Sequence, residues 1–441
     1  MGQSPGRFKS IFEVIEIMRI MVIGGGGREH AIIKKLKEDP RAEVIFALPG
    51  NGGIAADAQC VDIKATDIPG MVEFAKNNAI DFAVVAPDDP LVLGAVDALN
   101  EIGIPCFGPK ANAAIIEGSK AFSKDLMKRH NIPTAKYEIF TELDKALTYL
   151  DTAPIPTVVK ADGLALGKGV IIAQTREEAK TAVSEMMEGG KFGKSGTTVV
   201  IEEFLTGPEI SVLAFTDGKV VKPMVSSMDH KRAFDNDEGL NTGGMGTIAP
   251  NPYYTAEVAD RCMQEIFLPT INAMREEGRP FTGCLYFGLM LTVDGPKVIE
   301  YNCRFGDPET QVVLPLLESS LLEIMLATAN GTLAETEVKF ADKSAACVIL
   351  ASRGYPESYE KGFTITLPAT KENEQIYIAG AAQKDGTLVT SGGRVLGAVA
   401  VADDLKTAIA CSYDLADRIH FDNAFCRRDI GQRALKALGG N

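Results

Sequence analysis

The 441-residue sequence contains no tryptophan and only four histidines, and its eight cysteines are scattered singly, without a Cys-x-x-Cys pair or a neighbouring His cluster. This pattern indicates neither a zinc site nor a disulfide framework, and it favours a reducing, cytoplasmic compartment. Basic residues are also scarce, because 45 Lys and Arg face 59 Asp and Glu, leaving a formal net charge of −14. No long basic run offsets this charge, so nucleic acid is not expected as a partner.

Long hydrophobic runs are missing as well. No apolar stretch approaches the ~20 residues that span a bilayer, so no membrane association is expected. Within residues 1–17, Glu13 and Glu16 interrupt the apolar stretch that a signal peptide needs, and no small-residue cleavage site follows. We interpret these residues as an N-terminal extension before Met18, or as a short amphipathic contact element.

The composition is that of a globular protein, with 46% hydrophobic and 24% charged residues, and the length suggests about three domains of ~150 residues each. Strand and helix patterns alternate up to about residue 108, with helices expected over 68–78 and 91–102, which predicts a parallel sheet covered by helices. Hairpin-like strands follow to about residue 331, and short strands with a helix end the chain. The expected α/β architecture has boundaries at 18–120, 121–335 and 336–441.

The segment over residues 297–311 contains the most informative polar pattern. Side chains alternate faces along a strand, so Glu300 and Asn302 point the same way and can offer two hard oxygen ligands to one magnesium ion. Arg304 and a glycine turn follow directly, and a metal with a fixed cation suits an anionic phosphorylated substrate. Taken alone, an isolated Glu-x-Asn pair fits a strand end whose polar residues face water better than it fits a metal site, and the rest of the chain decides against that interpretation.

A glycine loop over residues 24–27 follows the first predicted strand, where backbone amides can approach a phosphate at a helix N-terminus. The acidic residue that a dinucleotide fingerprint needs after the second strand is absent, because Ala47-Leu48-Pro49 stands there. A substrate phosphate site and a tight turn remain alternatives for this loop. Asn51, in a second glycine turn, can line the same crevice at the sheet's carboxyl edge.

A second glycine segment runs from Lys160 to Gly169 and includes Lys168, between predicted strands at 157–159 and 170–173. A Walker-type loop would need Ser or Thr after the lysine and then a helix, whereas Gly169 and a strand follow here. We interpret the segment as a flap that folds over a triphosphate, with Lys168 close to it and Lys160 below. An ordinary glycine-rich hairpin turn has the same pattern.

Two later regions complete the set. The strand over residues 199–205 ends in a turn typical of an interlobe hinge. Backbone groups at such a hinge can hydrogen-bond with the edges of adenine, and Glu209 can accept hydrogen bonds from the ribose hydroxyls. Taken alone, the segment is just a strand that ends in a turn. Opposite charges are packed together over Asp229 to Arg232, and the turn at 243–246 offers amides that can hold an anion. His230 is interpreted as a hydrogen-bonded loop residue without a catalytic role.

In order and spacing these motifs resemble the phosphoribosylamine–glycine ligase family of ATP-grasp enzymes, from about Met18 to the C-terminus. The resemblance rests on the loop Gly24 to His30, the flap, and three further runs: Glu202-Glu203-Phe204-Leu205, Asp229-His230-Lys231-Arg232 and Arg304-Phe305-Gly306-Asp307-Pro308-Glu309. It implies a Rossmann-like N-terminal domain and an ATP-grasp domain over 121–335, with a mobile lobe at about 134–205.

The resemblance also implies the reaction. ATP would phosphorylate the carboxylate of glycine, and the amine of 5-phosphoribosylamine would attack the acyl phosphate, giving glycinamide ribonucleotide in purine biosynthesis. Glu300 and Asn302 would hold Mg²⁺ or Mn²⁺, and Arg304 and Lys160 would be catalytic. Residues implied to contact ATP are Lys124, Lys160, Lys168, Glu202, Leu205 and Glu209; those implied to contact the other substrates are Gly26, Asn51, Asp229, Lys231, Gly243, Gly244 and Arg304. A monomer or a dimer is expected.

The chain departs from the family pattern in places. Asp88 stands where a glutamate is expected, and residues 285–293 lack the additional metal carboxylate of many ATP-grasp enzymes, so a metal shell would include phosphate oxygens and water. Three alternatives stay open: another carboxylate–amine ligase or biotin-type carboxylase of the same fold, an ATP-binding regulator without turnover, and a dehydrogenase that uses the first glycine loop.

Overall fold

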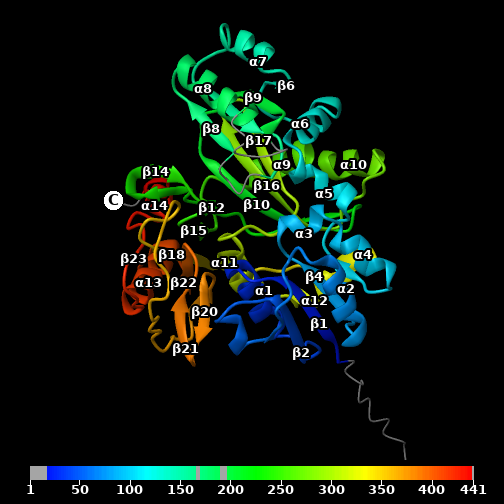
Figure 1. Ribbon diagram of the computed structural model, residues 1–441, viewed down its shortest axis with the longest axis vertical. Helices are drawn as coiled ribbons and strands as arrows, with labels where there is room; N and C mark the ends of the chain where they lie inside the picture. Colours follow the sequence, from blue (N-terminus) through cyan, green and yellow to red (C-terminus); the bar gives the residue numbers. More distant parts are fainter. Residues whose placement is uncertain (1–16, 165–168, 189–195, 440–441) are drawn as a thin grey trace, which may run out of the picture.

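The computed structural model describes residues 17–164, 169–188 and 196–439. An N-terminal part, a lobe at the top of the view, a central antiparallel sheet and a C-terminal part pack around a common centre (Figure 1). This confirms the predicted mixed α/β architecture. Within the described ranges, no helix combines the length and the apolar character needed to cross a membrane.

The N-terminal part is a five-stranded parallel sheet in the order β3-β2-β1-β4-β5. Its central strand is buried on both faces: Ile20 and Val22 belong to one hydrophobic core, and Met21 and Ile23 to another. Helices covering both faces explain why this strand is a continuous apolar run. The elements are β1 (Arg19–Gly24), α1 (Gly27–Leu36), β2 (Val44–Pro49), β3 (Gln59–Cys60), α2 (Ile68–Asn77), β4 (Phe82–Val85), α3 (Asp88–Val92), α4 (Ala95–Glu101), β5 (Cys106–Phe107) and α5 (Ala111–Gly118).

The single helix predicted over residues 91–102 is wrong, because the structure has two helices there. Helix α3 ends at Val92 and α4 begins at Ala95. Gly94 between them has φ +89°, a left-handed conformation that glycine adopts readily and that interrupts helical hydrogen bonding. The hydrophobic spacing continues across the break, so periodicity alone could not reveal it.

The lobe is a four-stranded antiparallel sheet in the order β6-β9-β7-β8. It has a hydrophobic core of its own, in which Val159 and Ile201 of the sheet pack with Leu150 and Val183 of its helices. A separate core is what a lobe that moves as a unit requires. Its elements are β6 (Tyr137–Phe140), α7 (Leu143–Leu150), β7 (Thr157–Ala161), β8 (Val170–Ala173), α8 (Arg176–Met187) and β9 (Val199–Glu203), and α6 (Lys120–Arg129) precedes it.

The central antiparallel sheet has the order β11-β10-β16-β17. Strand β10 pairs over its whole length with residues 283–290 of β16, and β16 pairs with β17. The elements of this region are β10 (Glu209–Thr216), β11 (Val221–Pro223), β12 (Met228–Asp229), β13 (Arg232–Phe234), β14 (Glu238–Asn241), β15 (Gly246–Ala249), α9 (Ala256–Cys262), α10 (Leu268–Glu276), β16 (Gly283–Thr292), β17 (Gly295–Asn302), α11 (Thr310–Val313) and α12 (Leu321–Asn330).

The C-terminal part has a sheet in the order β12-β15-β18-β22-β19, with β23 beside β18. Strand β15 pairs with β18 from Gly246 opposite Val348 to Ala249 opposite Ala345, so residues 228–249 and the C-terminal strands share one sheet. The boundaries near residues 120 and 335 stay predictions. The remaining elements are β18 (Ser344–Ser352), β19 (Glu374–Ile378), β20 (Ala381–Lys384), β21 (Thr387–Thr390), β22 (Arg394–Ala402), α13 (Leu405–Arg418), β23 (Ala424–Phe425) and α14 (Gln432–Ala437).

A buried neutral histidine fastens the C-terminal helix to this sheet. The backbone N–H of Gly431 donates to His230 Nε2 at 3.1 Å, so Nδ1 carries the proton and donates to the Gly246 carbonyl at 3.1 Å. Burial, followed by the positive charges of Arg427 and Arg433, lowers the pKa of His230 to about 4. The ring is therefore uncharged at neutral pH and has a structural role.

This histidine should make the fold sensitive to acid. An unfolded histidine titrates near about 6.5, so between pH 6.5 and 4 the unfolded chain binds a proton that the folded chain excludes, and stability falls as the pH drops through this window. We expect wild-type protein to lose about 2 kcal/mol more than His230→Gln between about pH 7 and 4.5 in urea unfolding. His420→Gln, at an exposed position, is the matched control. Parallel pH curves for wild type and His230→Gln would contradict this assignment.

Candidate active site

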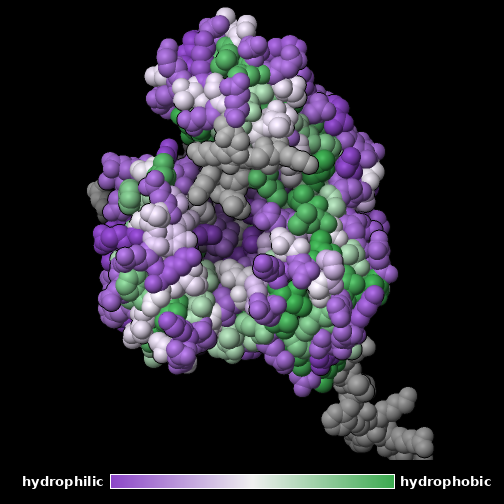
Figure 2. All heavy atoms as spheres, in the orientation of Figure 1, coloured by the Kyte–Doolittle hydropathy of each residue, from purple (hydrophilic) through white to green (hydrophobic). Residues whose placement is uncertain are grey.

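A cavity of about 490 Å³ lies between the lobe, the central sheet and the C-terminal sheet. In the space-filling view the centre of the molecule is hollowed, and the hollow is lined by hydrophilic side chains (Figure 2). Residues from segments far apart in the chain meet here. The predicted site residues that line the cavity are Lys124, Lys160, Glu202, Asp229, Lys231, Gly243, Glu300, Asn302 and Arg304.

The last residues of β17 place Glu300 and Asn302 on the cavity side. Tyr301 between them points the other way, into the core, where its hydroxyl hydrogen-bonds with Thr270 Oγ1 at 2.9 Å. A β-bulge precedes the pair, since Gly288 and Leu289 lie opposite Glu300 and Val298, which leaves Ile299 without a partner. Glu300 and Asn302 therefore lie on the same side of the strand, as predicted. The bulge leaves the Ile299 carbonyl beside them without a sheet partner.

Glu300 has a cationic neighbour. Lys231 Nζ lies 3.3 Å from Glu300 Oε1 and 3.2 Å from Glu209 Oε2, so it connects the strand with the hinge. Lys231 lowers the pKa of Glu300 to about 2 against the opposing effect of burial. Burial alone would lower the pKa of Lys231, but Glu209 and Glu300 outweigh it and raise that pKa well above its usual value. Glu300 is therefore an ionised, hard oxygen ligand at neutral pH.

Two lysines converge on one buried carboxylate at the back of the cavity. Glu202 of β9 lies between Lys124 of α6, at 2.8 Å, and Lys160 of β7, at 3.0 Å. Lys160 Nζ also donates to the unpaired Ile299 carbonyl at 2.9 Å, and Lys124 Nζ donates to Thr134 Oγ1 at 2.8 Å. Burial lowers the pKa of Lys124 to about 8, although Glu202 opposes the shift. Two cations thus share one anion, which leaves a positive surplus for phosphate oxygens.

The start of the predicted flap is tied to the N-terminus of α6. Ser119 Oγ and the Ala121 N–H both donate to Asp162 Oδ1, at 2.9 and 2.7 Å, and Lys120 Nζ donates to the Gly163 carbonyl at 2.9 Å. Lys120 also lines the cavity. Lys168, predicted at the tip of the flap, lies outside the described residues.

Arg304 lies where the N-terminal part meets β17. Its Nη2 is 2.9 Å from Glu117 Oε1 and 3.9 Å from Asp88 Oδ2. Burial opposes the charged form, but Glu117 and Asp88 outweigh it and raise the pKa of Arg304. The guanidinium is thus held by acids from α5 and α3 while it lines the cavity.

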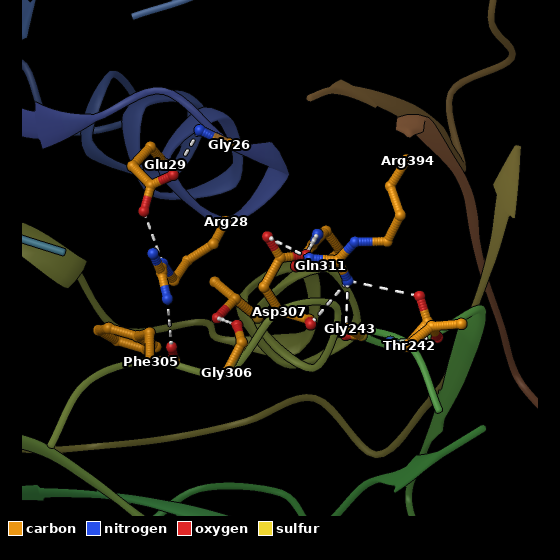
Figure 3. A network of polar contacts seen from close by, with 12 residues as sticks. Gly26, Arg28, Glu29, Thr242, Gly243, Phe305, Gly306, Asp307, Gln311 and Arg394 are labelled. Atoms are coloured by element: carbon orange, nitrogen blue, oxygen red, sulfur yellow. Dashed lines mark hydrogen bonds and ion pairs between the residues drawn. The ribbon is translucent and has the colours of Figure 1, made fainter. Parts of the chain in front are cut away.

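An arginine from the C-terminal part holds the glycine turn at 243–246 against the segment after β17. Arg394 Nη1 donates to the carbonyls of Gly243 and Asp307 at 2.6 and 2.9 Å, and Nη2 lies 3.3 Å from Asp307 Oδ2. Figure 3 shows Arg394, Gly243 and Asp307 meeting in one polar network. Both Gly243 and Arg394 line the cavity.

Asp229 and Gly244 are packed closely beside this network. Gly244 has φ +109°, and a Cβ there would lie 2.5 Å from Pro308 Cδ and 2.7 Å from Asp229 Oδ1. Asp229 Oδ1 accepts the His230 N–H at 2.7 Å. Burial, followed by the nearby charge of Glu309, raises the pKa of Asp229 well above its usual value. The glycine is thus needed both for its backbone angle and for its lack of a side chain.

Five predicted residues are not among those that line the cavity within the described ranges: Gly26, Asn51, Leu205, Glu209 and Gly244. Glu209 lies 3.2 Å from the lining Lys231, and Gly244 is packed beside Asp229. Asn51 uses its amide on the backbone: Nδ2 donates to the carbonyls of Gly25 and Ile378, both at 2.9 Å, and Oδ1 accepts two N–H groups of its own turn. Gly26 lies two residues before the lining Arg28, and its N–H donates to Glu29. Leu205 is half-buried just after β9.

Sequence reasoning assigned no role to several residues that the structure brings to the cavity: Arg28, Glu117, Lys120, Tyr286, Asp307, Glu309, Tyr355 and Arg394. Asp307 and Glu309 belong to the motif that begins at Arg304, so their position in the sequence indicated that they lie near a predicted site residue. Glu117 and Lys120 lie close to Ser119, the N-cap of the helix α6 that carries Lys124. Their closeness in the sequence to a predicted ATP contact could have indicated them in the same way. Arg394 had no local signal, because only the packing of the C-terminal sheet brings it here.

An antiparallel sheet and a separately packed lobe that enclose lysines and an acid–amide pair define an ATP-grasp enzyme. Family models described as phosphoribosylglycinamide synthetase match its N domain at residues 18–117, its ATP-grasp (A) domain at 118–310 and its C domain at 345–433. The chain belongs to the phosphoribosylglycinamide synthetase family, whose curated members are called phosphoribosylamine–glycine ligases.

Individual relatives agree with this family. The phosphoribosylamine–glycine ligase of Pasteurella multocida is 49% identical over 422 residues, which cover 95% of this chain and 98% of the relative. A crystal structure of the phosphoribosylamine–glycine ligase from Thermotoga maritima has a TM-score of 0.83 at 34% identity and covers 93% of this chain and 100% of that one. Biotin carboxylase from Campylobacter jejuni, with a TM-score of 0.73 at 15% identity over 93% of each chain, shares the fold.

Proposed function

We propose that this enzyme joins glycine to 5-phosphoribosylamine at the expense of ATP, in purine biosynthesis. A glycine carboxylate oxygen attacks the γ-phosphorus, which gives glycyl phosphate and ADP. The amine nitrogen then attacks the acyl carbon, loses a proton and expels phosphate, giving glycinamide ribonucleotide. The observation that supports this best is that Lys124, Lys160, Glu300 and Asn302 share one cavity in a chain 49% identical to phosphoribosylamine–glycine ligases over nearly its whole length.

In this proposal the nucleotide lies between the lobe and the central sheet. Lys124 and Lys160 neutralise phosphate oxygens, because Glu202 balances only one of their two charges. The adenine lies at the hinge near Glu202 and Leu205, and Glu209 accepts the ribose hydroxyls. Lys168 of the flap is assigned to the phosphates from the sequence alone.

Glu300 and Asn302 fit a divalent cation, Mg²⁺ or Mn²⁺, because one is an ionised carboxylate and the other an amide beside the same cavity. When bound, the cation would neutralise charge on the transferred phosphoryl group. Within the described ranges, no three His, Cys, Asp or Glu side chains form a metal site by themselves. Phosphate oxygens and water would therefore complete the shell.

The second half of the cavity would receive glycine and 5-phosphoribosylamine. Arg304 is assigned to the anionic groups of the reaction. Asp229 and Lys231 line the same cavity, and Lys231 lies 3.2 Å from Glu209 at the hinge. Gly243 and Gly244 are assigned to this side from the sequence, and their N–H groups donate to the Tyr355 hydroxyl at 3.0 Å and to Thr242 Oγ1 at 2.9 Å. Gly26 supports the same side from the N-terminal loop, and Asn51 supports it by holding that loop in place.

Catalysis then depends on placement and not on a covalent enzyme intermediate. The chain brings three substrates together, surrounds the migrating phosphoryl group with fixed cations and keeps water from the acyl phosphate. A single-chain monomer or a dimer, acting in the cytoplasm, is part of the same proposal.

The direct test measures ADP release with ATP, Mg²⁺ and candidate acceptor pairs. We expect ADP release that depends on glycine together with 5-phosphoribosylamine, and formation of glycinamide ribonucleotide. Bicarbonate and D-alanine serve as controls for a biotin-type carboxylase or another carboxylate–amine ligase. ADP release with either of these, but not with glycine plus 5-phosphoribosylamine, would overturn the proposal.

A further inference from the structure

Glu117 is a buried carboxylate that receives hydrogen bonds from three consecutive residues at the end of β17 and just beyond it. It lies in the last turn of α5, and only 7% of its side chain is exposed. Its Oε2 accepts the Cys303 N–H at 2.7 Å, and its Oε1 accepts Arg304 Nη2 at 2.9 Å. Oε1 also accepts the Asn302 amide nitrogen at 2.9 Å in the amide orientation that satisfies hydrogen bonding on both sides.

These contacts decide which way the amide group of Asn302 is turned. An amide side chain presents an oxygen on one side and an NH₂ group on the other, and the two are nearly equal in shape. A carboxylate accepts hydrogen bonds and donates none, so Glu117 selects the orientation in which the Asn302 nitrogen faces it. The Asn302 oxygen then points away from Glu117. Asn302 is itself one of the residues that line the cavity.

The same carboxylate fixes the backbone on which Asn302 and Arg304 are carried. Strand β17 ends at Asn302, so the Cys303 N–H has no sheet partner there and donates to Glu117. Metal ligands in proteins are oriented by such outer partners, whose removal costs 10–100-fold in metal affinity, on the order of 1–3 kcal/mol. Helix α5 belongs to the N-terminal part, so this carboxylate links it to the strand that carries the acid–amide pair.

We propose that Glu117 is a positioning residue that turns the amide oxygen of Asn302 toward the metal–nucleotide site and holds the guanidinium of Arg304 beside it. This inference rests on the proposed function only in taking Asn302 as a metal ligand. In this proposal Glu117 contacts neither the metal nor the nucleotide. It acts through its hydrogen bonds with Asn302, Cys303 and Arg304.

The test compares affinities, which do not require turnover. The affinity for ADP is measured by calorimetry with Mn²⁺ and again with EDTA, and the ratio isolates the metal's contribution. We expect Glu117→Gln to lower this ratio about tenfold, because a glutamine offers only one acceptor oxygen and lets the Asn302 amide turn over. ADP affinity in EDTA should change less than about twofold. Glu101→Gln, at the exposed end of α4, is the matched control.

A reciprocal double variant separates positioning from general structural support. In Glu117→Gln with Asn302→Asp, the glutamine amide donates to the new carboxylate, which keeps an oxygen for the metal, so we expect the ratio to return to within about threefold of wild type. Asn302→Asp alone places two carboxylates together and should not show this recovery.

Two results would overturn the role of Glu117. The first is an unchanged ratio of ADP affinity with Mn²⁺ to that with EDTA in Glu117→Gln. If this single variant does not fold, a folded double variant that still binds Mn²⁺–ADP weakly is the equivalent result. The second is a tenfold rise in the KM for glycine with the ratio intact, which would make Glu117 a direct substrate contact. A wild-type enzyme that binds Mn²⁺–ADP but never consumes glycine would instead refute the proposed reaction and leave this role standing.

Discussion

Glu300→Gln is expected to lower turnover by about a hundredfold, or roughly 3 kcal/mol of transition-state stabilisation, while leaving the fold intact. The substitution removes a negative ligand from the metal position but keeps the shape and one oxygen that can accept from Lys231, now 3.3 Å from Glu300 Oε1. Because Lys231 keeps the pKa of Glu300 at about 2, the lost group is fully ionised in wild-type enzyme at neutral pH.

The measurement is the initial rate of ADP formation across a range of Mg²⁺ concentrations, with thermal unfolding as a check on the fold. The loss should be largest at limiting Mg²⁺ and partly recovered at high Mg²⁺, since a weakened site is filled by mass action. Glu335→Gln, the same change at an exposed position, controls for the loss of one charge. Wild-type rates at limiting Mg²⁺ would remove Glu300 from the set of metal ligands.

Lys160→Met is expected to lower kcat/KM for ATP by 10²–10³-fold, on the order of 3–4 kcal/mol. Lys160 is buried and bridges Glu202 of the lobe, at 3.0 Å, and the Ile299 carbonyl beside the acid–amide pair, at 2.9 Å. Methionine keeps much of the side-chain volume but removes the cation that would face the phosphates. Glu202 retains Lys124 at 2.8 Å, so its carboxylate keeps a partner and the lobe stays folded.

The informative readout is the separation of kcat from KM for ATP at saturating glycine. A cation used mainly in the transition state lowers kcat, whereas one used equally before and during reaction raises KM. Lys145→Met in helix α7 of the same lobe is the control, since 69% of the Lys145 side chain is exposed and it forms an ion pair with Glu142. Unchanged values of both constants in Lys160→Met would exclude a role for this lysine in nucleotide turnover.

Sequence reasoning located the acid–amide pair because the rule behind it is local. Alternation along β17 puts Glu300 and Asn302 on one face wherever that strand lies, and the apolar run before them marked it as a strand. The alternation of strand and helix patterns up to about residue 108 predicted a parallel sheet covered by helices, and β1 is buried on both faces as such a sheet requires. The motifs also kept their order and spacing, which was enough to identify the family.

Partnerships between side chains could not be predicted in the same way. Glu202 was expected beside adenine, and no local pattern indicated that its carboxylate also lies between Lys124 and Lys160. These three side chains come from three different elements. The sequence offered Asn51 as a substrate contact, while its amide is engaged by backbone groups of the N-terminal loop and β19. Each of these outcomes depends on a long-range approach that no local pattern encodes.

The sequence by itself determined the family, the shared side of β17 on which Glu300 and Asn302 lie, and many of the strands and helices, although not the break between α3 and α4. Only the tertiary structure decided what each charged group faces: Lys231 between Glu209 and Glu300, Arg394 against Asp307, and Glu117 beneath Asn302. The physical reason is one of range. Backbone alternation and hydrophobic period act over a few residues, whereas pairing of strands such as β15 with β18 sets neighbours about a hundred residues apart, and the direction of an amide or guanidinium follows from those neighbours.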